Sequence, residues 1–150
     1  MRRIGIFLLV LILFSNCKKQ NATPTAALIF GTRSALCNLN CANFYLIRDA
    51  ALYQDTNHSA NAALSFVLSP LPGSKYQLAN SLVSNIPQYL RNDTGGSLGC
   101  PGCADGVIVH LEFTDLQRHT VKWDINSDTT LLPAEIRSYI QQVSTVLNQL

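Results

Sequence analysis

Two runs of strictly alternating residues near the end of the chain restrict its fold more than any other feature. In the first run, 107–113, every odd-numbered position is apolar, and in the second, 120–125, the odd positions are Val121, Trp123 and Ile125. Alternation with a period of two predicts β-strands with one buried and one solvent-facing side. The short polar segment between the runs predicts that the two strands form an antiparallel hairpin.

The alternation also predicts how the two strands pair. Their apolar sides lie on the same face of a sheet only if the numbers of paired residues have an even sum. A register that meets this condition places Glu112 opposite Lys122 and His110 opposite Asp124. Both are favourable cross-strand pairs, each contributing about 0.2–1 kcal/mol. We therefore expect His110 to be half of a surface pair rather than a catalytic residue.

Two further segments have the pattern of amphipathic helices. Segment 74–86 begins with a Ser-x-x-Gln sequence typical of a capping box and ends before Pro87, which interrupts helices. Pro133 suits the first position of a second helix. That helix has an apolar stripe made of Ile136, Ile140, Val143, Leu147 and Leu150.

The first half of the chain resembles the second in the order of its features. Strand-like segments 44–53 and 64–69 follow one cysteine pair and precede the first helix, and the apolar triplet 28–30 predicts a short initial strand. The repeated order of cysteine pair, strand, strand and helix suggests a ββα–ββα duplication. We expect an α+β fold, with a two-layer arrangement of an antiparallel sheet and both helices on one face.

The N-terminus has the pattern of an export signal. Arg2 and Arg3 precede the apolar run 4–14, which is shorter than the ~20 residues that span a bilayer, so residues 1–16 are interpreted as a signal peptide. Residues 13–17, LFSNC, resemble the lipobox of bacterial lipoproteins, in which the cysteine is lipidated and becomes the mature N-terminus. An uncleaved anchor with an incidental Cys17 is the alternative.

Lipidation of Cys17 would place several acyl chains on one residue, which is enough for stable membrane anchoring. Residues 17–27 are polar and small and predict a flexible tether, followed by a single domain, 28–150. Lys18 and Lys19 follow the lipobox instead of an aspartate that would retain the protein in the inner membrane. We expect a location in the cell envelope, on the outer membrane, facing the periplasm or the exterior.

The charge of the chain is balanced once the signal segment is set aside. Of the eleven Lys and Arg residues, Arg2 and Arg3 belong to that segment, and the remaining nine equal the nine Asp and Glu residues. There is no basic surplus of the kind that binds nucleic acid and no run of like charge. We therefore expect no nucleic-acid partner.

With Cys17 assigned to the lipid, four cysteines remain: Cys37, Cys41, Cys100 and Cys103. An even number of cysteines in an exported domain predicts disulfides, and three connectivities are open. Closing a ring of about four residues stabilises a fold by ~2 kcal/mol, and closing one of about sixty by ~4 kcal/mol. Pairing between the two halves is therefore favoured over local pairing.

Two other uses of these cysteines remain open. The sequence CPGCADG at 100–106 is similar to the knuckle of zinc ribbons, and Cys37 and Cys41 would complete a four-cysteine zinc site. A thiol–disulfide redox protein that uses Cys100 and Cys103 is the second alternative. The pair leads into a strand rather than a helix, and Asp105 disfavours a thiolate.

The sequence has no GxSxG elbow, HExxH helix or obvious carboxylate couple, so we predict neither an enzyme nor a cofactor or resident metal. The lipobox, the CPGCADG turn before a hairpin and the closing helix together look like small uncharacterised bacterial lipoproteins. This resemblance implies an envelope location and a similar fold, and no activity. The expectation is a disulfide-stabilised module that binds a protein, a peptide or another envelope ligand.

Overall fold

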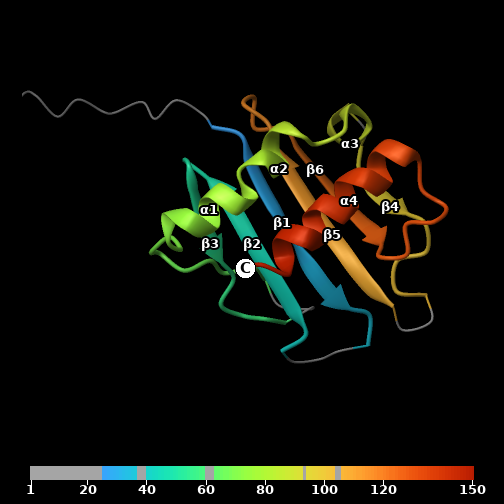
Figure 1. The fold of residues 1–150 in the computed structure, drawn as a ribbon, viewed down its shortest axis with the longest axis horizontal. Helices are drawn as coiled ribbons and strands as arrows, with labels where there is room; N and C mark the ends of the chain where they lie inside the picture. The colour runs from blue at the N-terminus through green and yellow to red at the C-terminus, as the bar shows by residue number, and fades with distance from the viewer. Residues whose placement is uncertain (1–24, 37–39, 60–62, 93, 104–105) are drawn as a thin grey trace, which may run out of the picture.

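The computed structural model describes residues 25–36, 40–59, 63–92, 94–103 and 106–150. These form one six-stranded sheet with helices packed against it (Figure 1). The strands are β1 (Ala27–Ser34), β2 (Ala42–Arg48), β3 (Ala51–Gln54), β4 (Gly96–Leu98), β5 (Val107–Thr114) and β6 (Thr120–Asn126). They lie side by side in the order β3-β2-β1-β5-β6-β4.

The sheet is antiparallel except at one edge. The pairs β1–β2, β1–β5, β2–β3 and β5–β6 are antiparallel, whereas β4 runs parallel to β6. The prediction of a wholly antiparallel sheet is therefore wrong for β4. This strand lies in the glycine-rich segment 95–99, which has no alternating pattern by which a strand could be recognised.

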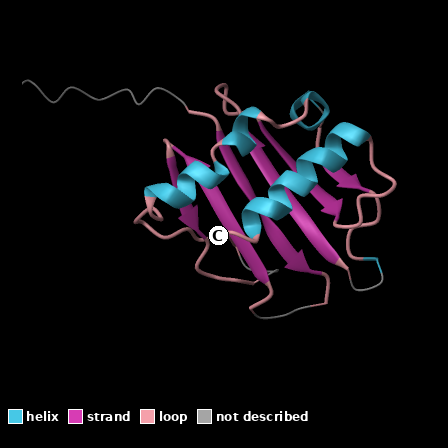
Figure 2. Cartoon of the chain, viewed as in Figure 1, coloured by secondary structure: helices cyan, strands magenta, loops and turns pink. Residues whose placement is uncertain are grey.

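The helices cover one face of the sheet, as expected for the α+β fold (Figure 2). They are α1 (Gly73–Ala79), α2 (Ser81–Ser84), α3 (Gln88–Asn92) and α4 (Ala134–Leu147). The hydrophobic core lies between these helices and the sheet. Its most deeply buried members are Leu28, Phe30, Leu52, Leu82, Leu90, Val109, Val121, Ile125, Ile136, Ile140 and Val143.

Two buried polar side chains connect the helices to the rest of the core. The indole Nε1 of Trp123, on β6, donates a hydrogen bond to the Leu90 carbonyl oxygen at 3.1 Å. The Tyr139 hydroxyl, on α4, donates to the Leu82 carbonyl oxygen at 3.0 Å. Burial raises the pKa of Tyr139 far above its usual value. Both polar groups are thus satisfied inside the core, as buried polar groups require.

The predicted hairpin is confirmed in its register. Glu112 pairs with Lys122 and His110 with Asp124 across β5 and β6. The predicted C-terminal helix is confirmed as α4, although Pro133 lies just before its first residue and Leu150 lies beyond its end. Strong periodicity in both segments is the reason that they could be read from the sequence.

The apolar triplet 28–30 lies in a strand that is longer and more central than predicted. β1 has eight residues and pairs with β2 on one side and β5 on the other. The full length of β1 was not predicted because Gly31 and the polar residues that follow it interrupt the apolar pattern.

The rest of the first half differs from the second. Segment 44–53 covers most of two strands, β2 and β3, which are joined at Asp49 and Ala50. These two residues have φ values of 53° and 56°. Positive φ at both central residues is the geometry of a type I′ hairpin turn. Segment 64–69 forms no strand, and within it Phe66 makes an isolated bridge with Asp55. The suggested ββα–ββα duplication is not confirmed.

The predicted helix 74–86 is divided into α1 and α2, which meet at Asn80. Pro72, rather than Ser74, precedes the first helical residue, and no side chain caps this end. The capping box is not formed because the helix begins at Gly73, two residues too early for Ser74 to occupy the capping position.

Several predictions fall outside the described residues. They are the signal peptide 1–16, the lipidation of Cys17, most of the tether 17–27, and the state of Cys37.

Candidate binding site on the open face of the sheet

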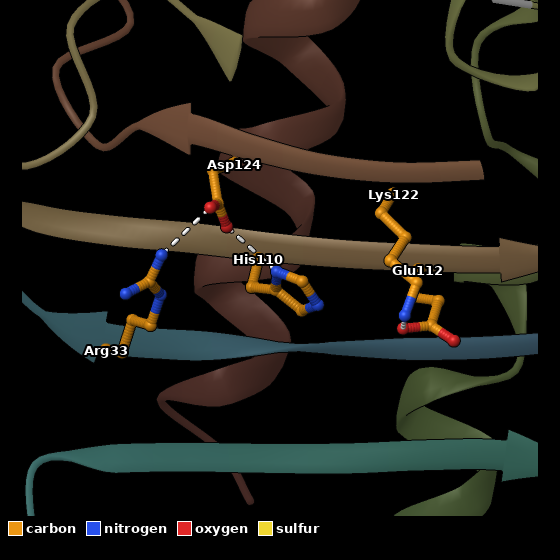
Figure 3. Close-up of polar contacts among 5 residues, drawn as sticks. All are labelled: Arg33, His110, Glu112, Lys122 and Asp124. Atoms are coloured by element: carbon orange, nitrogen blue, oxygen red, sulfur yellow. Dashed lines mark hydrogen bonds and ion pairs between the residues drawn. The ribbon is translucent and has the colours of Figure 1, made fainter. Parts of the chain in front are cut away.

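The face of the sheet opposite the helices is the candidate functional surface, which we call the open face. Successive side chains of a strand point to opposite sides, so this face is formed by residues that do not enter the core. In Figure 3, α4 passes behind the strands and the labelled side chains lie in front of them. The residues that define the open face are Arg33, Phe44, His110, Glu112, Lys122 and Asp124.

Asp124 is the centre of this group. Its Oδ1 lies 2.8 Å from His110 Nδ1, and its Oδ2 accepts a hydrogen bond from Arg33 Nη2, also at 2.8 Å (Figure 3). Burial raises the pKa of the Asp124 carboxyl, but the hydrogen bonds from His110 and Arg33 and the charge of Arg33 together lower it by more. The net shift is downward, so Asp124 is held as a carboxylate.

The contact with Asp124 orients the His110 ring. Nδ1 faces the carboxylate, so the other ring nitrogen, Nε2, points away from it (Figure 3). Among the described residues, Nε2 has no hydrogen-bond partner, and every buried side-chain nitrogen or oxygen has one. Nε2 is therefore accessible from the open face.

A missing side chain lets Phe44 reach His110. Gly31 of β1 stands between them, paired with Phe44 on one side and with His110 on the other. A Cβ atom on Gly31 would lie 2.6 Å from Cδ1 of the Phe44 ring. Without it, the Phe44 and His110 rings make an edge-to-face contact, with centroids 5.6 Å apart. His110 is thus fixed both by a hydrogen bond and by an aromatic contact.

Glu112 and Lys122 form a second ion pair beside His110. Lys122 Nζ lies 2.7 Å from Glu112 Oε2. The Glu112 side chain is 18% exposed and that of Lys122 is 65% exposed. The lysine is therefore the more accessible partner, and its ammonium group has further N–H donors directed away from Glu112.

Two depressions on the open face share His110, Lys122 and Asp124 in their linings. The first has a volume of about 340 Å³, and its apolar wall consists of Phe44 and residues 63–64. The second has a volume of about 540 Å³ and extends to the edge strand β4. Because they share three residues, the two depressions form a continuous surface around His110.

Residues 63–64 of the apolar wall belong to a loop that is held by a buried carboxylate. Asp55 is 1% exposed and accepts hydrogen bonds from the backbone N–H groups of Ser65, at 2.7 Å, and His58, at 3.2 Å. Thr56 N–H also donates to the Ser65 carbonyl oxygen at 2.7 Å. These bonds place residues 63–64 at the rim of the first depression.

Two of the described cysteines are paired with each other. Cys100 and Cys103 form a disulfide across a tight turn, with 5.5 Å between their Cα atoms, and Cys103 N–H donates to the Cys100 carbonyl oxygen. Cys41 is also disulfide-bonded. The preference for pairing between the halves is therefore wrong. The turn already brings Cys100 and Cys103 within the usual range of disulfide geometry, and its Gly102 supplies the required φ of 79°.

The same pairing removes two ligands from the predicted zinc alternative, since a disulfide has no thiolate to offer a metal. Within the part of the chain that the structure describes, no three His, Cys, Asp or Glu side chains gather closely enough to hold a metal ion. Cys100 and Cys103 are both exposed, so their disulfide is accessible to solvent.

Sequence reasoning found the His110–Asp124 and Glu112–Lys122 pairs but missed Arg33 and Phe44. They lie on β1 and β2, which reach the hairpin only through the pairing of β1 with the distant strand β5, so no local pattern connects them to the hairpin. Gly31 was the available signal, because a glycine inside a strand often marks a close approach of another group.

No protein-family model, curated protein or solved structure matches the chain. Of the helices in the described ranges, none has the length and apolar character needed to cross a membrane.

Proposed function

We propose that the chain is a lipid-anchored protein of the bacterial cell envelope whose α+β domain binds a ligand at the open face. The observation behind the binding site is the first depression, of about 340 Å³, where charged side chains face the apolar wall formed by Phe44 and residues 63–64. Ligand sites combine an apolar lining with a few placed polar groups, in volumes of about 300–1,000 Å³.

The polar groups of this surface are held in place before a ligand arrives. Asp124 and Phe44 restrict the His110 ring from two sides, and Arg33 restricts Asp124. A site whose side chains are already ordered loses less conformational entropy on binding. The restricted positions of these side chains favour a ligand-binding site over an ordinary solvated surface whose ion pairs are independent of one another.

The proposal of a lipid anchor rests on the lipobox-like sequence LFSNC at 13–17. Lys18 and Lys19, which stand where an inner-membrane retention signal would have an aspartate, favour the outer membrane. The mass of the purified protein should correspond to a chain that starts at Cys17 and bears acyl groups. Cys17→Ser should move the protein from the membrane fraction to the soluble fraction. An unmodified Cys17 in a chain that retains residues 1–16 would show that the anchor proposal is wrong.

The binding site can be tested through histidine, since the chain has three histidines. Selective ¹⁵N labelling of the imidazoles reports on His110, with His58 and His119 as internal references. Purified protein would be titrated with neutral sugars, free amino acids, dipeptides and small organic acids. We expect at least one class to shift the His110 signals and leave the two references in place. If no class shifts His110, the open face is not the ligand site.

A second candidate is favoured by one observation, the exposed local disulfide between Cys100 and Cys103. This is the oxidised form that a thiol–disulfide redox protein would have. The test is catalytic reduction of insulin disulfides by the prereduced protein, compared with Cys100→Ser. Turnover that disappears in the variant supports redox function, and equal rates in both proteins reject it.

A further inference from the structure

The open face has more unused hydrogen-bond donors than acceptors. Both oxygens of Asp124 are already engaged, one by His110 and one by Arg33. Glu112 is largely buried and bonded to Lys122. Among the described residues, Arg33 has one side-chain hydrogen bond, through Nη2, although a guanidinium has five N–H donors. A ligand that complements this surface must therefore supply acceptors.

The charge of the surface selects among acceptor groups. Arg33 and Lys122 balance Glu112 and Asp124, so the group is formally neutral when His110 is neutral and has one positive charge when His110 is protonated. β2, β4 and segment 63–64 contribute no charged side chain to the lining of either depression. One positive charge neutralises a bound monoanion, whereas a dianion such as a phosphate monoester would leave a net negative charge on this surface and would cost more to desolvate.

Protonation also changes what His110 offers. With Nδ1–H donating to Asp124, neutral His110 presents Nε2 as an acceptor, and protonated His110 presents Nε2–H as a donor. The accessible Nε2 and the exposed Lys122 ammonium then become two donors on the same depression. Hydrogen bonds between charged donors and a carboxylate are stronger than those between neutral groups.

We propose that the open face binds a monocarboxylate with an apolar substituent, in which the carboxylate contacts His110 Nε2 and Lys122 Nζ and the substituent lies against the apolar wall of Phe44 and residues 63–64. Arg33 acts as a positioning residue, since it holds Asp124 and through it the His110 ring. The proposal rests on the proposed binding function and names the chemical class of its ligand.

The experiment uses 3-phenylpropionate as the probe, with 3-phenylpropanamide as its uncharged equivalent. Phenyl phosphate is compared with the probe at about pH 8, where it is a dianion. Binding to the purified full chain is followed by the labelled imidazole signals at about pH 6 and pH 8, where the carboxyl group of the probe is ionised. Lys122→Met is the test variant. Arg118→Gln is its matched control, because it removes a positive charge from the β5–β6 turn, outside both depressions.

We expect the carboxylate to shift His110 and to bind more tightly at the lower pH. Lys122→Met should weaken binding by about tenfold, the factor that corresponds to ~1.4 kcal/mol, and Arg118→Gln should not. Lys122 is exposed, so the variant should fold, which the unchanged His58 and His119 signals would verify. Equal binding of the amide, preference for phenyl phosphate, or tighter binding at the higher pH would each overturn the proposal. If instead neutral sugars shift His110 and 3-phenylpropionate does not, the binding function stands and the carboxylate proposal fails.

Discussion

Replacement of Gly31 by alanine tests the packing on which the open face depends. A Cβ atom at this position would overlap the Asn43 carbonyl oxygen and would lie 2.6 Å from Cδ1 and 2.8 Å from Cα of Phe44. Two of these three atoms belong to the backbone of β2, so no change of side-chain rotamer can relieve the overlap. β1 and β2 must separate locally, at the centre of the sheet.

The expected cost follows from two opposing effects. Overpacking in a well-packed region destabilises a protein by about 1–3 kcal/mol, and backbone overlap places Gly31→Ala near the upper limit. Alanine is more favourable than glycine inside a strand by about 0.5–1 kcal/mol, because glycine loses more backbone entropy on folding. The free energy of unfolding should therefore fall by ~2 kcal/mol.

Urea denaturation measures this change. With an m-value of about 1.5–2 kcal/mol/M, the midpoint should fall by about 1 M without a change in m. Gly73→Ala is the matched control, because a Cβ atom on Gly73 meets nothing within 4 Å. The control should be neutral or slightly stabilising. If Gly31→Ala unfolds at the wild-type midpoint, β1 and β2 tolerate a side chain at this position, and the missing Cβ atom is not what lets Phe44 reach His110.

Three further predictions concern individual contacts. Trp123→Phe leaves the buried Leu90 carbonyl oxygen without its donor and should lower the free energy of unfolding by ~2 kcal/mol in urea; a loss below about 0.5 kcal/mol would contradict this role. The pKa of Asp124 is lowered from 3.8 on folding, so its contribution to stability is present above about pH 4 and is lost as the pH falls below that value. Asp124→Asn should therefore lose less stability than the wild type between about pH 5 and pH 2, and parallel acid-denaturation curves would contradict this. The double variant Cys100→Ala/Cys103→Ala opens a ring of about four residues and should lose ~2 kcal/mol, measured against the wild type without reductant; an unchanged midpoint would show that this turn is ordered without its disulfide.

The β5–β6 hairpin and α4 could be predicted from the sequence because their information is local. Each has a periodic pattern that spans the whole element, and the Glu112–Lys122 and His110–Asp124 pairs follow from the register alone. The α+β class could be predicted for the same reason, since it depends on the kinds of elements and not on their order in the sheet.

The order of the strands could not be predicted in this way. β1 pairs with β5, which lies more than seventy residues later in the chain, and β4 joins β6 in parallel without any alternating pattern. The candidate site depends on this long-range pairing, because it brings Arg33 and Phe44 beside the hairpin. The cysteine pairing was also wrongly predicted. Loop entropy favours a long disulfide ring only where the fold brings the two ends of that ring together. In this fold the turn at 100–103 brings Cys100 and Cys103 together instead.

The distribution of strand lengths has a consequence for association between copies of this chain. The long strands β1 and β5 are neighbours inside the sheet, while its two edges are β3, with four residues, and β4, with three. A long exposed edge is a template for pairing with a second chain, and short edges are one way in which proteins avoid it. Gly95, just before β4, and Gly96, its first residue, have φ values of 83° and 139°, which depart from an extended strand. The sheet therefore offers little backbone for edge-to-edge aggregation, even where copies are concentrated on a surface.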